Sequence, residues 1–414
     1  MVGTKRLQSL DILRGITVAG MILVNNGWGE SFEMLQHSKW NGMTPCDLVF
    51  PFFLFIMGVS CYLSLVKSEF RPTPQVLRRI LKRTVLLFAI GLFINWFDHA
   101  VEGDLLCFGH LRIWAVMQRI ALCYCCVSLF AVYCSHRYTI PTIIGLLVVY
   151  SAILLLGNGY AYDAEANILA QADLRLFGYD HVYHKSPVDP EGLLGTISSV
   201  AHVMIGFYCG MLIRRKKTME RKIIAIFVVG AVLVIGGYLL SYGLPLNKRV
   251  WSPSYVMATC GLASLLLALL INEELRMKNE ENEELRIKNE EFATALPTEE
   301  TENSTPNAGD PTPNAEDLTL NAGNPTSAAA NSSFFILHSS FFKVFGVNAL
   351  ALYVSSELLA ILLGHLGISE WVYSGIHALI PLPKLASLAY AVYFVLLNFL
   401  IGYVLYRRKI FIKL

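Results

Sequence analysis

Residues 37–66 read HSKWNGMTPCDLVFPFFLFIMGVSCYLSLV. The stretch opens as a polar, aromatic loop and passes without a break into an apolar run from about residue 45 to residue 66. A helix needs about 20 mostly apolar residues to cross a hydrocarbon core of about 30 Å, and this run is long enough. The sequence therefore predicts a transmembrane helix that begins beside a polar loop, an arrangement that suits chemistry at a membrane surface.

The rest of the chain has the same membrane character. Hydrophobic residues make up 55% of its 414 residues, charged residues only 15%, and the mean hydropathy is +0.51. We predict an all-α polytopic membrane helix bundle with about 10, alternatively 11, transmembrane helices. The ten expected spans are residues 8–26, 45–66, 78–97, 112–133, 138–156, 195–213, 222–243, 253–272, 343–364 and 384–406. The short apolar piece at residues 371–380 is predicted to be interfacial or re-entrant, with an eleventh span as the alternative.

Lysine and arginine residues predict the orientation. They concentrate before the first span and in residues 67–83, 214–222 and 407–409, which all fall on one side if ten helices alternate. We therefore expect an integral protein of an inner or plasma membrane, with an uncleaved first helix and both termini cytoplasmic. The net charge of +2 reflects this topology and indicates no nucleic-acid partner. The opposite, outer loops hold most of the His, Trp, Asp and Asn residues outside the low-complexity insert.

One segment departs from the membrane pattern. Residues 272–340 are first charged, with NEELRMKNEE nearly repeated as NEELRIKNEE, and then rich in Asn, Thr, Pro and Ala. Such a composition cannot bury a core, so we predict a disordered, low-complexity cytoplasmic insert apart from a short charged helix. The insert would divide a membrane core into residues 1–271, with helices one to eight, and residues 341–414, with the last helices.

Two polar residues at the outer end of the first span suggest a reaction. Asn25 ends that span and His37 follows in the loop. A neutral imidazole can take a proton at physiological pH, and an amide can donate to a developing oxyanion, so the pair suits acyl transfer. Alternatively, Asn25 caps the helix and His37 only hydrogen-bonds its own loop.

Several motifs along the chain together resemble the heparan-α-glucosaminide N-acetyltransferase family. The motifs are SLDILRG at 9–15 with VN at 24–25, residues 37–51, QRIAL at 118–122, DPEGLLGT at 189–196, PLNK at 245–248 with WSPSY at 251–255, and NAL at 348–350 with Tyr353 and Glu357. The resemblance covers nearly the whole chain except the insert.

The resemblance implies an integral membrane acetyltransferase that uses cytosolic acetyl-CoA to acetylate the amine of a glucosamine-type sugar on the outer face. It implies that His37 is the catalytic histidine and that Asn25 is a second active-site residue. Since only a short segment precedes the first span, it further implies a bacterial-type relative that acts on a small amino sugar or glycan fragment. The residues do not distinguish direct attack by the sugar amine from transfer through an acetyl-histidine.

Polar residues within or beside the spans are the other candidates, because a buried charge in a membrane needs a partner or a function. Arg14 either pairs with Asp11 or meets a phosphate of CoA. Asp47 either supports the start of the second span or binds substrate. The remaining candidates for substrate binding are Gln118, Arg119, Asp189, Glu191, Asn247, Lys248, Trp251, Asn348 and Glu357.

Each of these candidates also has a structural interpretation. Arg119 is either a cavity residue or an ion-pair partner of Glu357, and Asp189 and Glu191 either hold a protonated amino sugar or favour a helix start. Trp251 is either an interfacial anchor or a stacking surface for sugar. The spacing of His99, His110, His181 and His184 forms no recognisable ligand set with carboxylates, so we predict no metal.

Two other functions are left open by the sequence. A transporter of sugars or glycan fragments also fits a bundle of about ten helices with polar groups near the midplane. An O-acyltransferase that modifies a glycan hydroxyl would differ only in its pocket. A strict requirement for acetyl-CoA would separate the enzyme from the transporter. Oligomeric state is also open, a homodimer included.

Overall fold

The computed structural model describes residues 7–295 and 340–412, with the side chains of 290–295 left out. The regular structure in these residues is entirely helical, so the predicted all-α class is confirmed. The longer helices are α1 (Gln8–Asn25), α2 (Val49–Leu65), α3 (Pro74–Val101), α4 (Val116–Tyr133), α5 (Thr139–Leu156), α6 (Ile168–Phe177), α7 (Gly195–Arg215), α8 (Met219–Leu240), α9 (Pro253–Ala295), α11 (Ala349–His365), α12 (Ile368–Leu379) and α13 (Pro383–Arg407). Short 3₁₀ turns are η1 (Glu33–Leu35), η2 (Pro45–Leu48), η3 (Val66–Ser68), η4 (Cys107–Gly109), η5 (His136–Tyr138) and η6 (Tyr179–His181).

Eight helices in the described part of the chain are long and apolar enough to cross a membrane. A ninth span results if the helices Ser340–Val347 and Ala349–His365, which meet at 83°, count as one bent span. The chain is thus a polytopic helical membrane protein. The eight spans are Pro45–Ser68, Pro74–Val101, Val116–Tyr133, His136–Leu156, Gly195–Arg215, Met219–Leu240, Pro253–Asn289 and Pro383–Arg407.

The expected first span, residues 8–26, forms a helix but is not among the eight. Polar side chains in the first half of α1 lower its apolar character, and Asp11 there pairs with Arg14 at 3.1 Å. Val18 and Ile22 of α1 are buried in a core cluster with residues of α11 and α13. We attribute the difference to this environment, since a helix surrounded by protein does not need an apolar surface on every side.

The bend before α11 lies at Asn348, which has non-helical backbone angles. Its amide donates to the carbonyl oxygen of Ile410 at 3.0 Å and its side-chain oxygen accepts from Ile412 N at 3.0 Å. Asn348 therefore connects the C-terminal segment to the bend, and both polar atoms of its side chain form hydrogen bonds there. The short apolar piece at 371–380 forms most of α12, whose 12 residues are too few to span, and its Trp371 is 77% exposed.

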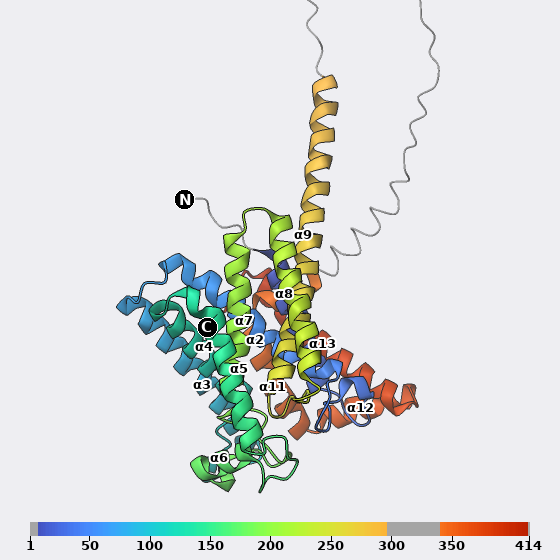
Figure 1. Cartoon of the computed structure of the whole chain (residues 1–414). Coiled ribbons are helices and arrows are strands. Elements are labelled where there is room, and N and C mark those ends of the chain that lie inside the picture. The colour runs from blue at the N-terminus through green and yellow to red at the C-terminus, as the bar shows by residue number, and fades with distance from the viewer. Residues whose placement is uncertain (1–6, 296–339, 413–414) are drawn as a thin grey trace, which may run out of the picture. The chain divides into compact units, whose positions relative to one another are not determined.

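The centre of the bundle is the crossing of α2 and α7 (Figure 1). Gly58 of α2 lies against the carbonyl oxygen of Val203, and Gly206 of α7 lies against the carbonyl oxygen of Phe55. A Cβ at either glycine would collide with backbone, so these two residues allow the helices to touch. Asp47 lies in η2, which leads directly into α2, and Gly195 begins α7, so both central helices start at the polar loops described below.

The chain divides into two compact units, one formed by Met1–Asn272 with Phe341–Leu414 and the other by Glu273–Ser340. In the second unit, residues 273–295 are helical, and ion pairs such as Lys278–Glu274 at 2.6 Å and Arg276–Glu280 at 3.2 Å support the helix. This helical stretch corresponds to the short charged helix that the sequence predicts within the insert. The disorder predicted for the rest of the insert falls on residues 296–339, which lie outside the described residues.

Candidate active site

The loop that follows α1 is held in place at Asp47. In η2, the Asp47 carboxylate accepts hydrogen bonds from the backbone N–H and the hydroxyl of Thr44, both at 3.1 Å, and Pro45 occupies the first helical position. Thr44 and Asp47 thus form a capping box. The backbone N–H of Ser38 donates to the same carboxylate at 3.1 Å. Asp47 is fully buried by these contacts.

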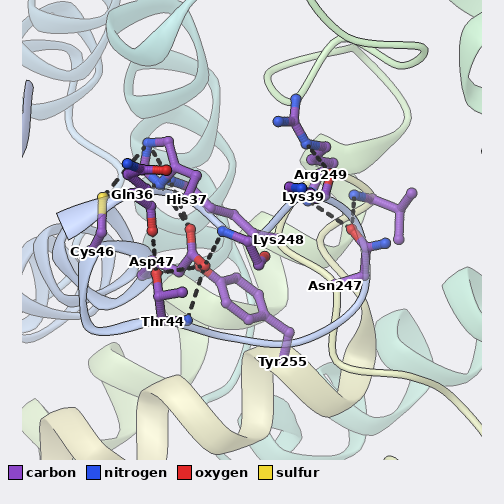
Figure 2. Close-up of polar contacts among 12 residues, drawn as sticks. Gln36, His37, Lys39, Thr44, Cys46, Asp47, Asn247, Lys248, Arg249 and Tyr255 are labelled. Carbon is purple, nitrogen blue, oxygen red and sulfur yellow. Dashed lines mark hydrogen bonds and ion pairs between the residues drawn. The ribbon is translucent and has the colours of Figure 1, made fainter. Parts of the chain in front are cut away.

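The other oxygen of Asp47 holds His37. The His37 Nδ1 lies 2.8 Å from Asp47 Oδ1, while 46% of the His37 side chain is exposed (Figure 2). Because an ionised carboxylate can only accept, Nδ1 carries the proton in this pair and Nε2 keeps its lone pair. The arrangement fixes both the tautomer and the orientation of an imidazole that a substrate can reach.

Lys248 is the second neighbour of His37. Its Nζ lies 3.0 Å from His37 Nδ1, 3.2 Å from Nε2 and 3.5 Å from Asp47 Oδ1. Burial lowers the pKa of the Lys248 ammonium, although the nearby Asp47 carboxylate opposes this effect. The site therefore combines a base, a buried anion and a nearly buried cation within hydrogen-bonding distance.

Asn247 attaches the loop that carries Lys248 to the loop that carries His37. Its amide donates to Asn41 Oδ1 at 3.1 Å, and its side-chain oxygen accepts from the backbone N–H groups of Arg249 and Val250. Gly42 N also donates to Leu246 O at 2.7 Å. Asn247 thus sets the shape of its loop and fixes the position of Lys248.

Cys46 is a contact of His37 that the sequence does not reveal. The scattered cysteines of this chain look like small apolar filler, yet the Cys46 Sγ lies 3.1 Å from His37 Nδ1 (Figure 2). Cys46 is the neighbour of Asp47 in η2, and both side chains contact His37 Nδ1. Its place before Asp47 is the signal that could have drawn attention to it.

A second polar cluster is centred on Arg112, which sequence reasoning also missed. Arg112 binds Asp189 at 2.7 Å and Glu191 at 3.0 Å, and its guanidinium lies 4.4 Å from the ring centroid of Tyr183. Asp189 additionally accepts from the backbone N–H groups of Tyr183 and Glu191. Asp189 is therefore saturated, whereas Glu191 is held by one arginine.

Asn25 does not join His37. Its amide donates to Glu357 Oε1 at 3.3 Å, and within the described residues no hydrogen bond connects it to His37. Glu357 is consequently the partner of Asn25 rather than of Arg119.

Of the two alternatives for Arg119, the ion pair with Glu357 is not formed. Arg119 is 1% exposed, donates to Gly192 O at 2.9 Å, and lies 5.2 Å from the ring centroid of Trp251. Its Nε and Nη1 atoms, and both polar atoms of the neighbouring Gln118, lack a hydrogen-bond partner in the part of the chain that is described. These two residues are interior groups with unused hydrogen-bonding capacity.

Trp251 fits neither of its expected roles. It is 1% exposed and packs against Phe50, Tyr255 and His202, so it can neither anchor the chain at the bilayer interface nor stack on a sugar that arrives from solvent. It is a core residue because the loop before α9 turns inward at this point, where Trp251 has a positive φ of 50°. Hydropathy does not reveal such a turn.

Arg14 shows the pairing that the i,i+3 spacing suggested. Its guanidinium contacts Asp11 at 3.1 Å, Ser60 Oγ at 2.8 Å and Gly346 O at 3.3 Å. These interior partners join α1 to α2 and to the segment before α11. Such contacts give Arg14 a structural role at the junction.

One small group in the described residues has the composition of a metal site. His99, Asp104 and His110 place ligand atoms within 4.8 Å of one another, and His110 Nε2 lies 3.0 Å from Asp104 Oδ2. The interpretation that these histidines form no set with carboxylates overlooked the turn after α3, which brings the three residues together. The absence of a metal stays a prediction.

Together, the fold and the site define a polytopic membrane protein with a histidine–aspartate pair and a lysine at one end of its bundle. Residues 6–187 match the family described as heparan-alpha-glucosaminide N-acetyltransferase, catalytic. The chain is 30% identical over 329 residues to heparan-alpha-glucosaminide N-acetyltransferase of Homo sapiens and 28% identical over 322 residues to that of Mus musculus. These matches confirm the family resemblance that the motifs indicate.

The comparisons also set the extent of the likeness. Each covers 64% of this chain and 48% or 49% of the relative, so the chain spans about half the length of the curated relatives it matches. The family match contains Asn25, His37, Asp47 and Arg112 but ends before Lys248. The contact between Lys248 and His37 therefore joins the matched region to a later part of the chain.

Proposed function

We propose that this protein is a membrane-embedded acetyltransferase that moves an acetyl group from cytosolic acetyl-CoA to the amine of a glucosamine-type sugar at the outer face. The observation that carries the proposal is the half-exposed His37, whose Nδ1 is bound by the buried carboxylate of Asp47 at 2.8 Å. A fixed imidazole whose Nε2 keeps its lone pair, here 3.2 Å from Lys248 Nζ, is the group that acyl transfer to an amine requires.

In the direct route, the amine nitrogen attacks the thioester carbonyl carbon and forms the N–C bond. The carbonyl π electrons move to oxygen, and the amine proton passes to His37 Nε2. When the tetrahedral intermediate collapses, the C–S bond breaks and the thiolate takes the proton from the imidazolium. Asp47 stabilises that imidazolium and prevents ring rotation. An acetyl-histidine route would use the same Nε2 as the nucleophile.

Lys248 is the better candidate for the oxyanion donor. Its Nζ lies 3.2 Å from His37 Nε2, beside the reacting atoms, whereas the Asn25 amide donates to Glu357. A donor of this kind contributes about 3 kcal/mol when it meets a developing oxyanion in a dry site. Asn25 would then act on substrate together with Glu357, by orienting a carboxylate toward the sugar.

The acceptor would be recognised through carboxylates. Glu191 keeps its place through Arg112, and Glu357 through Asn25. A protonated amino sugar suits these anions before it gives up a proton to react. The donor acetyl group has to reach His37 through the bundle, and the unused polar atoms of Gln118 and Arg119 support a polar path there.

The decisive experiment measures acetyl transfer from labelled acetyl-CoA to glucosamine-containing acceptors by the purified protein in liposomes. We expect transfer by the wild type, none by His37→Ala, and normal transfer by His365→Ala, which removes an exposed histidine outside the site. Size-exclusion profiles and thermal midpoints verify that the variants are folded. Uptake of sugar without acetyl-CoA, with no transfer to any amine, would favour a transporter, and acetylated hydroxyls would favour an O-acyltransferase.

A further inference from the structure

A cluster of three ligating side chains lies at the turn after α3, separate from His37. His99 is near the end of α3, Asp104 follows the turn, and His110 comes directly after η4. Each offers one ligand atom, and these three atoms lie within 4.8 Å of one another. The cluster shares no residue with the candidate active site, so the proposed acetyl transfer does not explain it.

Two imidazoles and one carboxylate form a donor set that is typical of zinc sites. His110 Nε2 lies 3.0 Å from Asp104 Oδ2, and the rings of His99 and His110 meet edge to face with centroids 5.1 Å apart. Around a tetrahedral Zn²⁺, ligand atoms about 2 Å from the ion lie about 3.3 Å from each other. Small side-chain rotations therefore convert the observed spacing into a shell of three protein ligands with one open position. Mg²⁺ and Ca²⁺ prefer oxygen ligands and suit this set less well.

A hydrogen bond between His110 and Asp104 accounts for only two of the three groups. Within the described residues, no hydrogen bond or ion pair involves the His99 imidazole, although its ring lies against that of His110. Three carboxylates occur in residues 98–104, whereas residues 84–111 contain no Lys or Arg. The net negative charge of this stretch attracts cations. A bound divalent cation would engage His99 and offset that charge.

The backbone holds the turn in the shape that brings the three ligands together. Asp104 N donates to His99 O at 3.0 Å, and Gly103 has a positive φ of 96° that other residues adopt poorly. His110 N donates to Cys107 O at 3.0 Å, and the Cys107 side chain is fully buried. The ligands therefore approach one another without a metal ion, and a site formed in advance binds with a smaller entropic cost.

An ion at this turn would act on the segment that carries Arg112. Arg112 is two residues after His110 and holds Glu191 at 3.0 Å. The helix α3 already contacts this segment through the Asn95 amide, which donates to Arg112 O at 2.8 Å. Coordination by His99 of α3 and by His110 would add a second link between the helix and the segment.

We propose that His99, Asp104 and His110 bind one divalent transition-metal ion of the zinc type, which connects the end of α3 to the segment before α4. This proposal departs from the sequence-based prediction of no metal, which considered the spacing of the histidines but not the turn between them. The role of the ion is structural. The inference does not depend on the proposed acetyl transfer.

Calorimetric titration with Zn²⁺ tests the site in the purified, chelator-treated full chain in detergent. We expect one ion per chain. His99→Ala, His110→Ala and Asp104→Asn should each weaken binding about 100-fold, since even the outer partners of metal ligands contribute about 10–100-fold. Glu102→Gln on the same turn and His365→Ala, an exposed histidine elsewhere, should bind like the wild type. Absence of binding by the wild type, or equal affinity in the ligand variants, would overturn the proposal.

Two further measurements locate the ion, with metal-free thermal midpoints verifying that the variants are folded. Co²⁺ in place of Zn²⁺ should give the intense visible absorption of a four-coordinate site in the wild type and in His37→Ala, but not in His99→Ala. Zn²⁺ should slow amide hydrogen exchange in residues 99–113 of the wild type but not of Asp104→Asn. Cobalt absorption that disappears in His37→Ala would place the ion at the candidate active site and overturn the proposal. Unchanged exchange would overturn the proposed connection to the Arg112 segment.

Discussion

At the scale of single residues, Asp47 makes two kinds of contact, and only one of them can be predicted from the local sequence. One carboxylate oxygen closes the capping box with Thr44, and the other binds His37. The sequence allowed the prediction of the first task, because a Thr-Pro-x-Asp pattern before an apolar run is typical of a helix start. The second depends on the path of a loop ten residues long, which no local pattern encodes.

The Asp47→Asn variant should therefore retain the fold and lose most of its activity. An amide can present its N–H to His37 Nδ1, which favours the wrong tautomer and removes the charge that stabilises the imidazolium. By analogy with other histidine–carboxylate pairs, we expect kcat to fall by about 10²–10⁴-fold. Stability should fall by about 1 kcal/mol through the weaker cap. Steady-state kinetics with thermal unfolding checks both, and a near-normal kcat would contradict the assigned role.

The raised pKa of Asp173 predicts how the stability of the protein depends on pH. Its pKa is raised from 3.8 to about 6 by burial, so the folded protein retains the proton over a range in which the unfolded chain has released it. The stability contribution of Asp173 is complete below about pH 4 and is lost as pH rises through about 6. Relative to Asp173→Asn, the wild type should lose up to about 3 kcal/mol across this window. Thermal midpoints of both proteins between pH 4 and 7 provide the measurement, and parallel curves would contradict it.

At the scale of elements, apolar runs predicted the spans because a crossing helix needs about 20 mostly apolar residues, whether they face lipid or other helices. Eight of the ten expected spans correspond to helices that qualify by length and composition. The two others, α1 and the bent pair at Asn348, depend on neighbours: α1 is surrounded by protein, and the bend is fixed by Ile410 and Ile412. Tertiary contacts of this kind leave little trace in the local sequence pattern.

The α2–α7 crossing predicts a sharp difference between two glycine substitutions. Gly206→Leu puts a side chain into the backbone of Phe55, whereas Gly145→Leu on α5 meets no atom within 4 Å. Gly206→Leu should destabilise the protein by about 1–3 kcal/mol or more, since backbone cannot move aside easily. Gly145→Leu should be neutral or slightly stabilising. Thermal midpoints in one detergent compare the two, and equal midpoints would show that the crossing tolerates separation.

At the scale of the whole molecule, the candidate site is assembled from segments far apart in the chain. His37 and Asp47 come from the loop after α1, Lys248 from the loop before α9, and Arg112 from the segment before α4. The motifs allowed the residues to be predicted one by one, but not their partners. The pairing of Asn25 with Glu357 spans 332 positions and that of Lys248 with His37 spans 211, so only the folded bundle determines them.

The same arrangement predicts which side of the membrane the site faces. Asp47 lies in η2, which leads into α2, and Gly195 begins α7, while both helices run toward basic residues, with Lys67 just after α2 and Arg215 at the end of α7. Because basic loops stay in the cytoplasm, the site should open to the opposite side. Right-side-out vesicles loaded with labelled acetyl-CoA should therefore acetylate an impermeant glucosamine-containing acceptor added outside.

The matched control for this direction places acetyl-CoA and acceptor together outside sealed vesicles, where transfer should fall to the level of leakage. Detergent should then restore it, because donor and acceptor reach their own sides of each molecule. A lysine-reactive, impermeant reagent offers an independent check, since the exposed Lys185 in the segment after α6 should be labelled from outside and Lys67 only after permeabilisation. The reverse pattern would place the site in the cytoplasm, and the enzyme would then transfer acetyl groups without moving them across the membrane.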